Sequence, residues 1–104
     1  MKVIAFDLDG IFVPDIEGFT GTADELEIRS RMVPLFIPDF PFLIITGRPS
    51  QDLPYTKDWI NRFFKKDTLL FHRNETIGTE SSALYKAKVL NELGDSVLYY
   101  VESD

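Results

Sequence analysis

Hydrophobic residues along this chain form short continuous runs separated by longer segments in which polar and apolar positions alternate at helical spacing. Four runs, at residues 3–6, 42–45, 68–71 and 97–101, are apolar at nearly every position. Such runs are typical of strands that are buried on both faces of a parallel sheet. We therefore predict four strands at these positions.

Three helices are predicted between the strands. The first opens at Thr22-Ala23-Asp24-Glu25, which fits the capping-box pattern. The second covers residues 55–64, and the third covers residues 82–93 and stops at Gly94. Apolar residues that we expect to face the core recur in all three helices: Leu26, Ile28 and Met32; Trp59, Ile60, Phe63 and Phe64; Leu84, Val89, Leu90 and Leu93.

The strict alternation of strand and helix predicts the fold. Strands joined through helices form right-handed crossovers and a parallel sheet that is covered by helices. We expect a single α/β domain over residues 1–104, with a three-layer, Rossmann-like parallel sheet. Binding sites in such sheets lie beyond the carboxyl ends of the strands, so the residues just after each strand are the first candidates for function.

Composition narrows the class of protein. Of the 104 residues 44% are hydrophobic, including nine Phe, which is enough for a core. The net charge of −6 argues against nucleic acid or an anionic membrane surface as the main partner. The chain has no cysteine, which excludes disulfides and thiolate zinc sites. No apolar run is long enough to span a membrane and the start lacks a signal-peptide pattern, so we expect a cytoplasmic protein.

Two carboxylates directly after the first strand give the clearest chemical signal. Asp7-Leu8-Asp9-Gly10 follows the apolar run, and residues i and i+2 of a strand point to the same face. Carboxylates this close repel each other unless a proton or a cation lies between them. A hard divalent cation, Mg²⁺, held by oxygen ligands fits this arrangement, while an ordinary turn is the structural alternative.

Polar residues at three other positions complete a candidate constellation. Thr46-Gly47 follows the second strand, and Glu102-Ser103-Asp104 follows the last. The third helix carries Lys86 and Lys88, of which we favour Lys86 because it stands four residues before Leu90. For Thr46 a turn-capping role is the alternative to a ligand contact. Arg48 is left outside this set, and His72 is interpreted as a residue at the end of a strand.

These residues, in this order, resemble the four motifs of the haloacid dehalogenase-like (HAD) superfamily of phosphotransferases. Asp7-Leu8-Asp9-Gly10 looks like the first motif, Thr46-Gly47 like the second, Lys86 like the third, and the acidic tail like the fourth. The resemblance implies a phosphatase in which Asp7 is the nucleophile and forms an aspartyl-phosphate.

The resemblance also implies the other roles. Asp9 would protonate the leaving oxygen and later activate water. Thr46 and the Gly47 amide would hold the phosphoryl oxygens, and Lys86 would offset their charge. Mg²⁺ would be bound by Asp7, by the backbone carbonyl of Asp9, and by one of two acids at the C-terminal end, between which the sequence does not choose: Glu102 and Asp104.

Family members that act on small molecules often carry a cap domain, but here the intervals between the motifs are filled by the helices and strands of the sheet. An uncapped site would admit large phosphorylated substrates, or would be closed by a partner. The segment from Pro14 to Gly21 is the candidate for a small flap beside Asp7. A short sheet would also expose an edge strand, through which the chain could form a homodimer.

Two other functions stay open. The irregular spacing of Glu102 and Asp104 would also suit a non-catalytic domain that binds phosphate or a metal and acts through a partner. A receiver-like signalling domain also combines acids, Thr and Lys on a parallel sheet. It is disfavoured because its phosphoacceptor lies on a strand well into the chain, whereas Asp7 follows the first strand.

Overall fold

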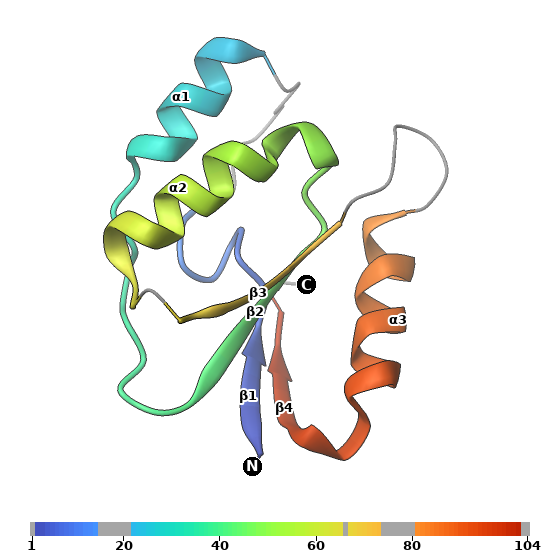
Figure 1. Cartoon of the computed structure of the whole chain (residues 1–104). Helices are drawn as coiled ribbons and strands as arrows, with labels where there is room; N and C mark the ends of the chain where they lie inside the picture. Colours follow the sequence, from blue (N-terminus) through green and yellow to red (C-terminus); the bar gives the residue numbers. More distant parts are fainter. Residues whose placement is uncertain (1, 15–21, 66, 74–80, 103–104) are drawn as a thin grey trace.

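A computed structural model describes residues 2–14, 22–65, 67–73 and 81–102 of the chain. Four strands form one sheet in which every pair is parallel: β1 (Val3–Phe6), β2 (Phe42–Thr46), β3 (Leu69–His72) and β4 (Val97–Val101). Their order across the sheet is β3-β2-β1-β4 (Figure 1). The predicted parallel α/β fold is therefore confirmed.

The predicted helices are also present: α1 (Ala23–Arg31), α2 (Leu53–Phe63) and α3 (Ser82–Leu93). Single 3-10 turns precede α2 (Ser50–Asp52) and follow α3 (Gly94–Ser96). Helix α2 begins two residues earlier than predicted because Pro54 lies in its first turn, where the missing N–H donor costs nothing. Strand β3 lies one residue further along than predicted, since its last residue, His72, pairs with Thr46 of β2.

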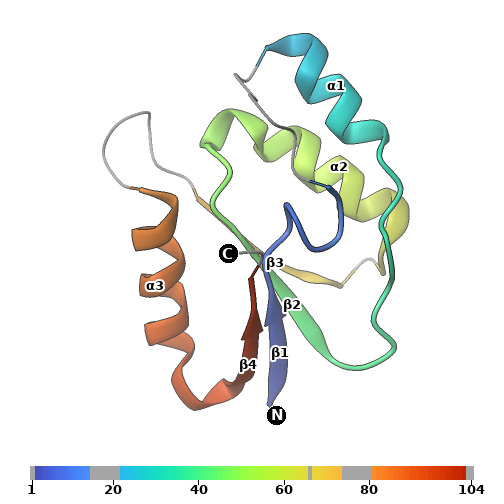
Figure 2. The same cartoon turned by 180° about the vertical axis from the view of Figure 1, so that it is seen from behind.

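The two faces of the sheet carry separate hydrophobic clusters, as successive strand residues point to opposite sides. On one face Phe6 and Ile44 pack with Trp59, Ile60 and Phe64 at α2. On the other face the cluster contains Ala5, Leu43 and Ile45 from the sheet and Val89 from α3. Figures 1 and 2 show α2 and α3 on opposite sides of the strands, with α1 beside α2.

Helix α1 is attached mainly through α2. The predicted capping box is formed: the Glu25 amide donates to Thr22 Oγ1 over 3.3 Å, and the Thr22 amide donates to Glu25 Oε1 over 3.0 Å. Leu26 is the residue of α1 that is buried. Ile28, predicted to face the core, is 56% exposed, since α1 packs mainly on α2 and not on the sheet. Leu84 of α3 was likewise predicted to point inward and is 50% exposed.

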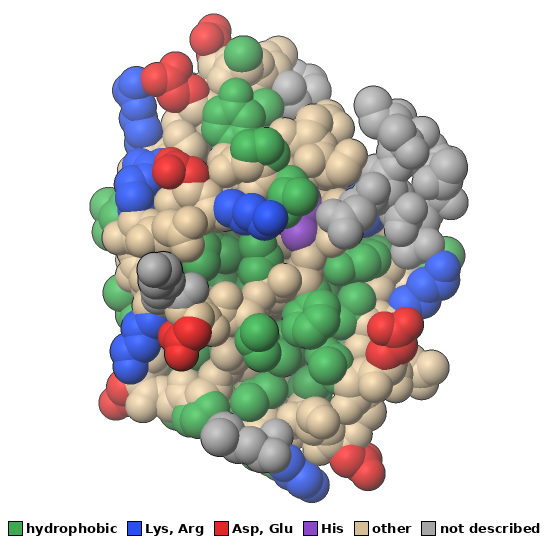
Figure 3. Space-filling view, viewed as in Figure 1, with side chains coloured by type: hydrophobic (Ala, Val, Ile, Leu, Met, Phe, Trp, Pro, Cys, Tyr) green, Lys and Arg blue, Asp and Glu red, His purple; other side chains and the backbone are tan. Residues whose placement is uncertain are grey.

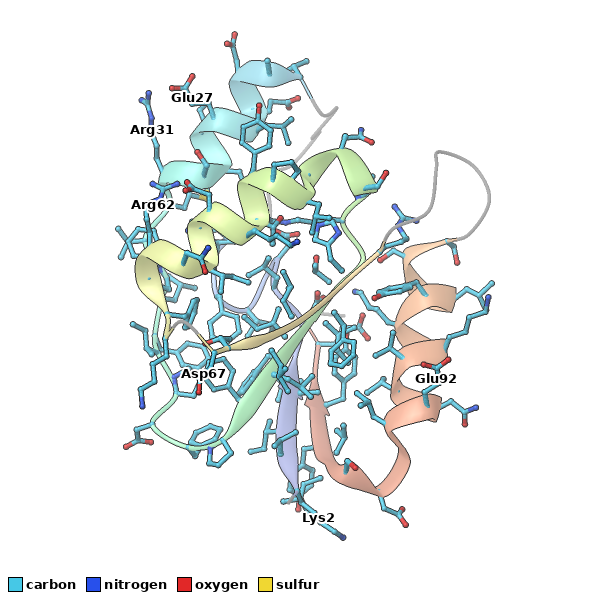
Figure 4. The ribbon with its side chains drawn as sticks, viewed as in Figure 1. Lys2, Glu27, Arg31, Arg62, Asp67 and Glu92 are labelled. Atoms are coloured by element: carbon cyan, nitrogen blue, oxygen red, sulfur yellow. The ribbon has the colours of Figure 1, made fainter. Side chains whose placement is uncertain are left out.

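The outer surfaces of the helices are charged. Arg31 pairs with Glu27 on α1, and Arg62 pairs with Asp58 on α2 over 2.7 Å. Figure 4 shows the labelled side chains of Glu27, Arg31 and Arg62 on the outside of the molecule. Among the described residues, no helix has the length and hydrophobicity needed to cross a membrane.

Candidate functional site

The candidate site lies at the carboxyl ends of the strands, where the sheet topology changes direction. The chain leaves β1 for β2 and then β3 on one side, and returns through α3 to β4 on the other side of β1. Ligands of open parallel sheets bind in the crevice at such a switch point. Here Asp7 directly follows β1 and Glu102 directly follows β4, the neighbouring strand at this switch point.

Asp7 is held rigidly at the end of β1. Its backbone amide donates to the Val101 carbonyl over 2.9 Å, which continues the pairing with β4. One carboxylate oxygen, Oδ1, accepts from the Leu8 amide over 2.8 Å. Beyond it Gly10 adopts a left-handed φ of 84°, and its amide donates to the Val13 carbonyl over 2.7 Å. The predicted sharp turn after the strand is therefore present, and it fixes the position of the Asp7 carboxylate.

Lys86 joins the two acids across the crevice. It lies one turn into α3, a helix capped by the Ser81 side chain. Its Nζ atom donates to Asp7 Oδ2 over 3.0 Å and to Glu102 Oε1 over 2.8 Å. Lys88, the alternative lysine, occupies an exposed position of α3. Residues 79 positions apart in the sequence thus meet in one cluster, and Lys86 is the lysine that contacts Asp7.

Burial shifts the proton equilibria of this cluster. The Asp7 side chain is almost buried, and this desolvation raises the pKa of its carboxyl although the Lys86 contact opposes the shift. For Lys86 desolvation favours the neutral amine, but the hydrogen bonds and charges of Glu102 and Asp7 outweigh it and raise the pKa of the ammonium. The lysine is therefore charged at neutral pH.

Asp9, the second acid of the pair, is bound by a buried arginine. Arg48 makes a bidentate contact with it: Nε donates to Oδ2 over 2.9 Å and Nη2 donates to Oδ1 over 2.7 Å. Arg29 Nε lies 3.8 Å from the same Oδ1. Burial works to raise the pKa of the Asp9 carboxyl, but the Arg48 hydrogen bonds and the two positive charges outweigh it, so the pKa is lowered.

A second buried acid extends this network. Arg29 Nη1 of α1 donates to Asp52 Oδ2 over 3.0 Å, and Arg48 Nη1 donates to Thr56 Oγ1 over 3.0 Å. The contacts connect α1 and the start of α2 to the loop after β1. Sequence reasoning missed Arg29 and Asp52, and it left Arg48 outside the site. Only Arg48 had a local signal, its place directly after Thr46-Gly47, because the others are brought in by the packing of α1 on α2.

Thr46 is the last residue of β2, one residue beyond the predicted end of this strand, and Gly47 follows it at the same edge of the sheet. The Thr46 side chain is 1% exposed, and its Oγ1 accepts from the Arg48 amide over 3.2 Å, so the hydroxyl caps the turn. At Gly47 the backbone passes close to the start of α3, and a Cβ atom there would lie 1.6 Å from Ser82 Oγ. Close packing therefore accounts for glycine at this position, independently of any ligand.

The carboxylate oxygen atoms at this edge of the sheet are ligands that Mg²⁺ prefers in proteins, but the described residues supply few of them. Asp7 and Glu102 both point to Lys86, while the Asp9 carboxylate is occupied by Arg48. Within the described residues, no group of three or more acidic or histidine side chains is placed to hold a metal ion. Asp104 lies outside the described residues, as does the proposed flap apart from Pro14.

Comparisons of the chain with protein-family models, with curated proteins and with solved structures gave no match. Any function of this chain must therefore be inferred from its own residues and contacts.

Proposed function

We propose that the protein is an uncapped, HAD-like phosphoester hydrolase with a three-layer, Rossmann-like fold. The observation that carries the proposal is the contact of Lys86 with Asp7 and Glu102 at the topological switch point. A buried carboxylate beside a fixed ammonium, in the crevice where parallel sheets bind ligands, is suited to attack on an anionic phosphoester.

In the proposed reaction Asp7 is the nucleophile. A carboxylate oxygen of Asp7 forms a bond to phosphorus while the bond from phosphorus to the ester oxygen breaks, and water then hydrolyses the aspartyl-phosphate. The Leu8 amide orients one carboxylate oxygen, and Lys86 lies against the other at 3.0 Å. The ammonium offsets the negative charge that the phosphoryl group brings to Asp7.

The phosphoryl oxygens are proposed to bind the Thr46 hydroxyl and the Gly47 amide, both at the carboxyl edge of the sheet. Mg²⁺, when bound, would neutralise charge between the carboxylates and the phosphoryl group. Its proposed protein ligands are the Asp7 carboxylate, the Asp9 backbone carbonyl and an acid of the C-terminal segment, either Glu102 or Asp104. Lys86 would then share Asp7 with the cation, and would share Glu102 as well if that acid is the ligand.

The proposed acid–base role of Asp9 requires a change of partner. A general acid needs a raised pKa, whereas pairing with Arg48 lowers the pKa of the Asp9 carboxyl. Catalysis by Asp9 therefore requires that substrate binding draws Arg48 away from Asp9, for example through contact of the guanidinium with the phosphate group.

The same ion pair favours a second candidate function. If Arg48 stays on Asp9, this carboxyl stays ionised and cannot protonate the leaving group. The site would then bind phosphate or a metal without turnover and act through a partner. The two candidates differ in turnover, and this difference can be measured directly.

The deciding experiment uses the full chain with p-nitrophenyl phosphate and Mg²⁺. Asp7→Asn should lower turnover by about a thousandfold or more because the nucleophile is lost. Asp24→Asn, which changes an exposed acid on α1, is the matched control and should leave turnover unchanged. Equal turnover of the wild type and Asp7→Asn would exclude the aspartyl-phosphate mechanism.

Absence of turnover across a panel of phosphoesters would favour the non-catalytic function, provided that calorimetry shows binding of inorganic phosphate that depends on Mg²⁺ and on Asp7. Because the described residues in the intervals between the site residues form the helices, strands and connecting segments of this one α/β fold, the proposed substrate class includes large phosphorylated molecules. We further propose a cytoplasmic location, with homodimer formation through a sheet edge as a hypothesis for sedimentation experiments.

A further inference from the structure

A groove between α2 and β3 shares no lining residue with the carboxylate–lysine cluster of Asp7, Lys86 and Glu102. Its volume is about 420 Å³, within the range of small-molecule sites. Helix α2 contributes Lys57, Ile60 and Asn61 to its lining. The other side is formed by Thr68, directly before β3, and by Leu70 and His72, which alternate along β3 and so face α2. Figure 3 shows hydrophobic side chains gathered over the middle of the molecular face on which β3 lies.

His72 gives this groove an unusual polar group. Its side chain is 5% exposed, and Nδ1 lies 2.9 Å from the Arg73 carbonyl oxygen. A carbonyl only accepts hydrogen bonds, so Nδ1 must carry the proton and donate it. Desolvation lowers the pKa of the imidazole and keeps it neutral at pH 7. The second nitrogen, Nε2, is then a bare acceptor.

That acceptor is buried and has no hydrogen-bond partner among the described residues. Buried polar atoms in folded proteins are nearly always satisfied, so this nitrogen of a residue that lines the groove indicates a missing donor. The other residues that line the groove indicate which further chemical groups the ligand would carry. Ile60 and Leu70 provide apolar surface, while Lys57, at an exposed position, provides positive charge at the rim.

We propose that the α2–β3 groove is a second ligand site, which binds a small molecule with an O–H or N–H donor, an apolar body and an anionic group. The donor bonds to His72 Nε2, the apolar body covers Ile60 and Leu70, and the anionic group faces Lys57. The residues of this site are distinct from Asp7, Lys86 and Glu102, so the proposal stands independently of the proposed hydrolase activity.

The test uses 4-hydroxyphenylacetate, which carries all three features, and isotope-labelled full-length protein. Titration monitored by NMR should shift the amide resonances of Lys57, Asn61 and Leu70 and the His72 Nε2 resonance in a saturable way. The amides of Asp7 and Lys86 should not move. The matched probe 4-methylphenylacetate lacks the donor and should bind about fivefold to thirtyfold more weakly, since it leaves Nε2 unsatisfied.

Two variants test the charged rim. Lys57→Ala should weaken binding of 4-hydroxyphenylacetate about twofold to fivefold, as expected for an exposed charge pair. Lys65→Ala, which removes an exposed lysine beyond the end of α2 and outside this groove, should leave the affinity unchanged. The proposal is overturned if the shifts do not saturate, if they centre on Asp7 and Lys86, or if both probes bind equally well. Each probe comparison uses wild-type protein, so the result does not depend on whether a variant folds.

Discussion

Replacement of Arg48 by methionine should destabilise the protein mainly through the carboxylate of Asp9, and also through loss of the hydrogen bond to Thr56 Oγ1. Methionine keeps much of the side-chain volume but leaves Asp9 without its bidentate partner. Loss of one partner of a buried ion pair generally costs about 3–5 kcal/mol. Here the Asp9 side chain is 20% exposed and Arg29 remains 3.8 Å away, so we expect about 2–3 kcal/mol.

The measurement is urea unfolding of the wild type, Arg48→Met, Asp9→Asn and the double variant. Asparagine removes the charge that lacks a partner, so Asp9→Asn should stabilise the Arg48→Met protein although it destabilises the wild type. The coupling free energy should be about 1.5–3 kcal/mol. An exposed pair, Arg62 and Asp58, is the control and should show no more than about 0.5 kcal/mol.

The pH dependence of the free energy of unfolding provides a second, independent test of the Asp9–Arg48 ion pair. Because the pKa of Asp9 is lowered by folding, its ion pair stabilises the protein above the unfolded value of 3.8, and this stabilisation is lost as the pH falls through the lower, folded pKa. In Arg48→Met the folded pKa should rise, so the acid-dependent loss of stability should become smaller. A coupling free energy below about 0.5 kcal/mol, together with unchanged pH dependence, would refute this account of Asp9.

Three further predictions concern single residues. Lys86→Met should lower the proposed phosphatase turnover about a hundredfold. The pH profile of turnover should move upward, because Asp7 then ionises less readily. Lys88→Met is the control. Gly47→Ala should destabilise the protein by about 1–3 kcal/mol through its clash with Ser82, and Ser82→Gly should restore part of that loss in urea unfolding. Thr22→Ala removes the cap of α1 and should cost about 1 kcal/mol in thermal unfolding, whereas no loss would contradict the capping role.

The strands and helices of this protein are largely set by local sequence. Strands β1 and β4 and helix α3 have the predicted limits, because each is an apolar or periodic segment with a clear stop such as Gly94. The limits of β3 depended on its pairing with β2, which no local pattern encodes. The exposure of Ile28 and Leu84 likewise depended on what each helix packs against, since helical periodicity identifies an apolar face but not its partner.

In the candidate site, too, some features follow from the sequence and others only from the tertiary structure. Asp7, Thr46 and Lys86 could be singled out from the sequence, because each follows or faces the end of a strand in a parallel fold. The partner of each charge was decided only by tertiary structure. Asp9 meets Arg48 and Arg29 because α1 docks on α2 beside the loop after β1, and ion pairs between such distant segments depend on packing rather than spacing. The sequence by itself thus determined which groups stand at the edge of the sheet, and the fold determined which of them neutralise one another.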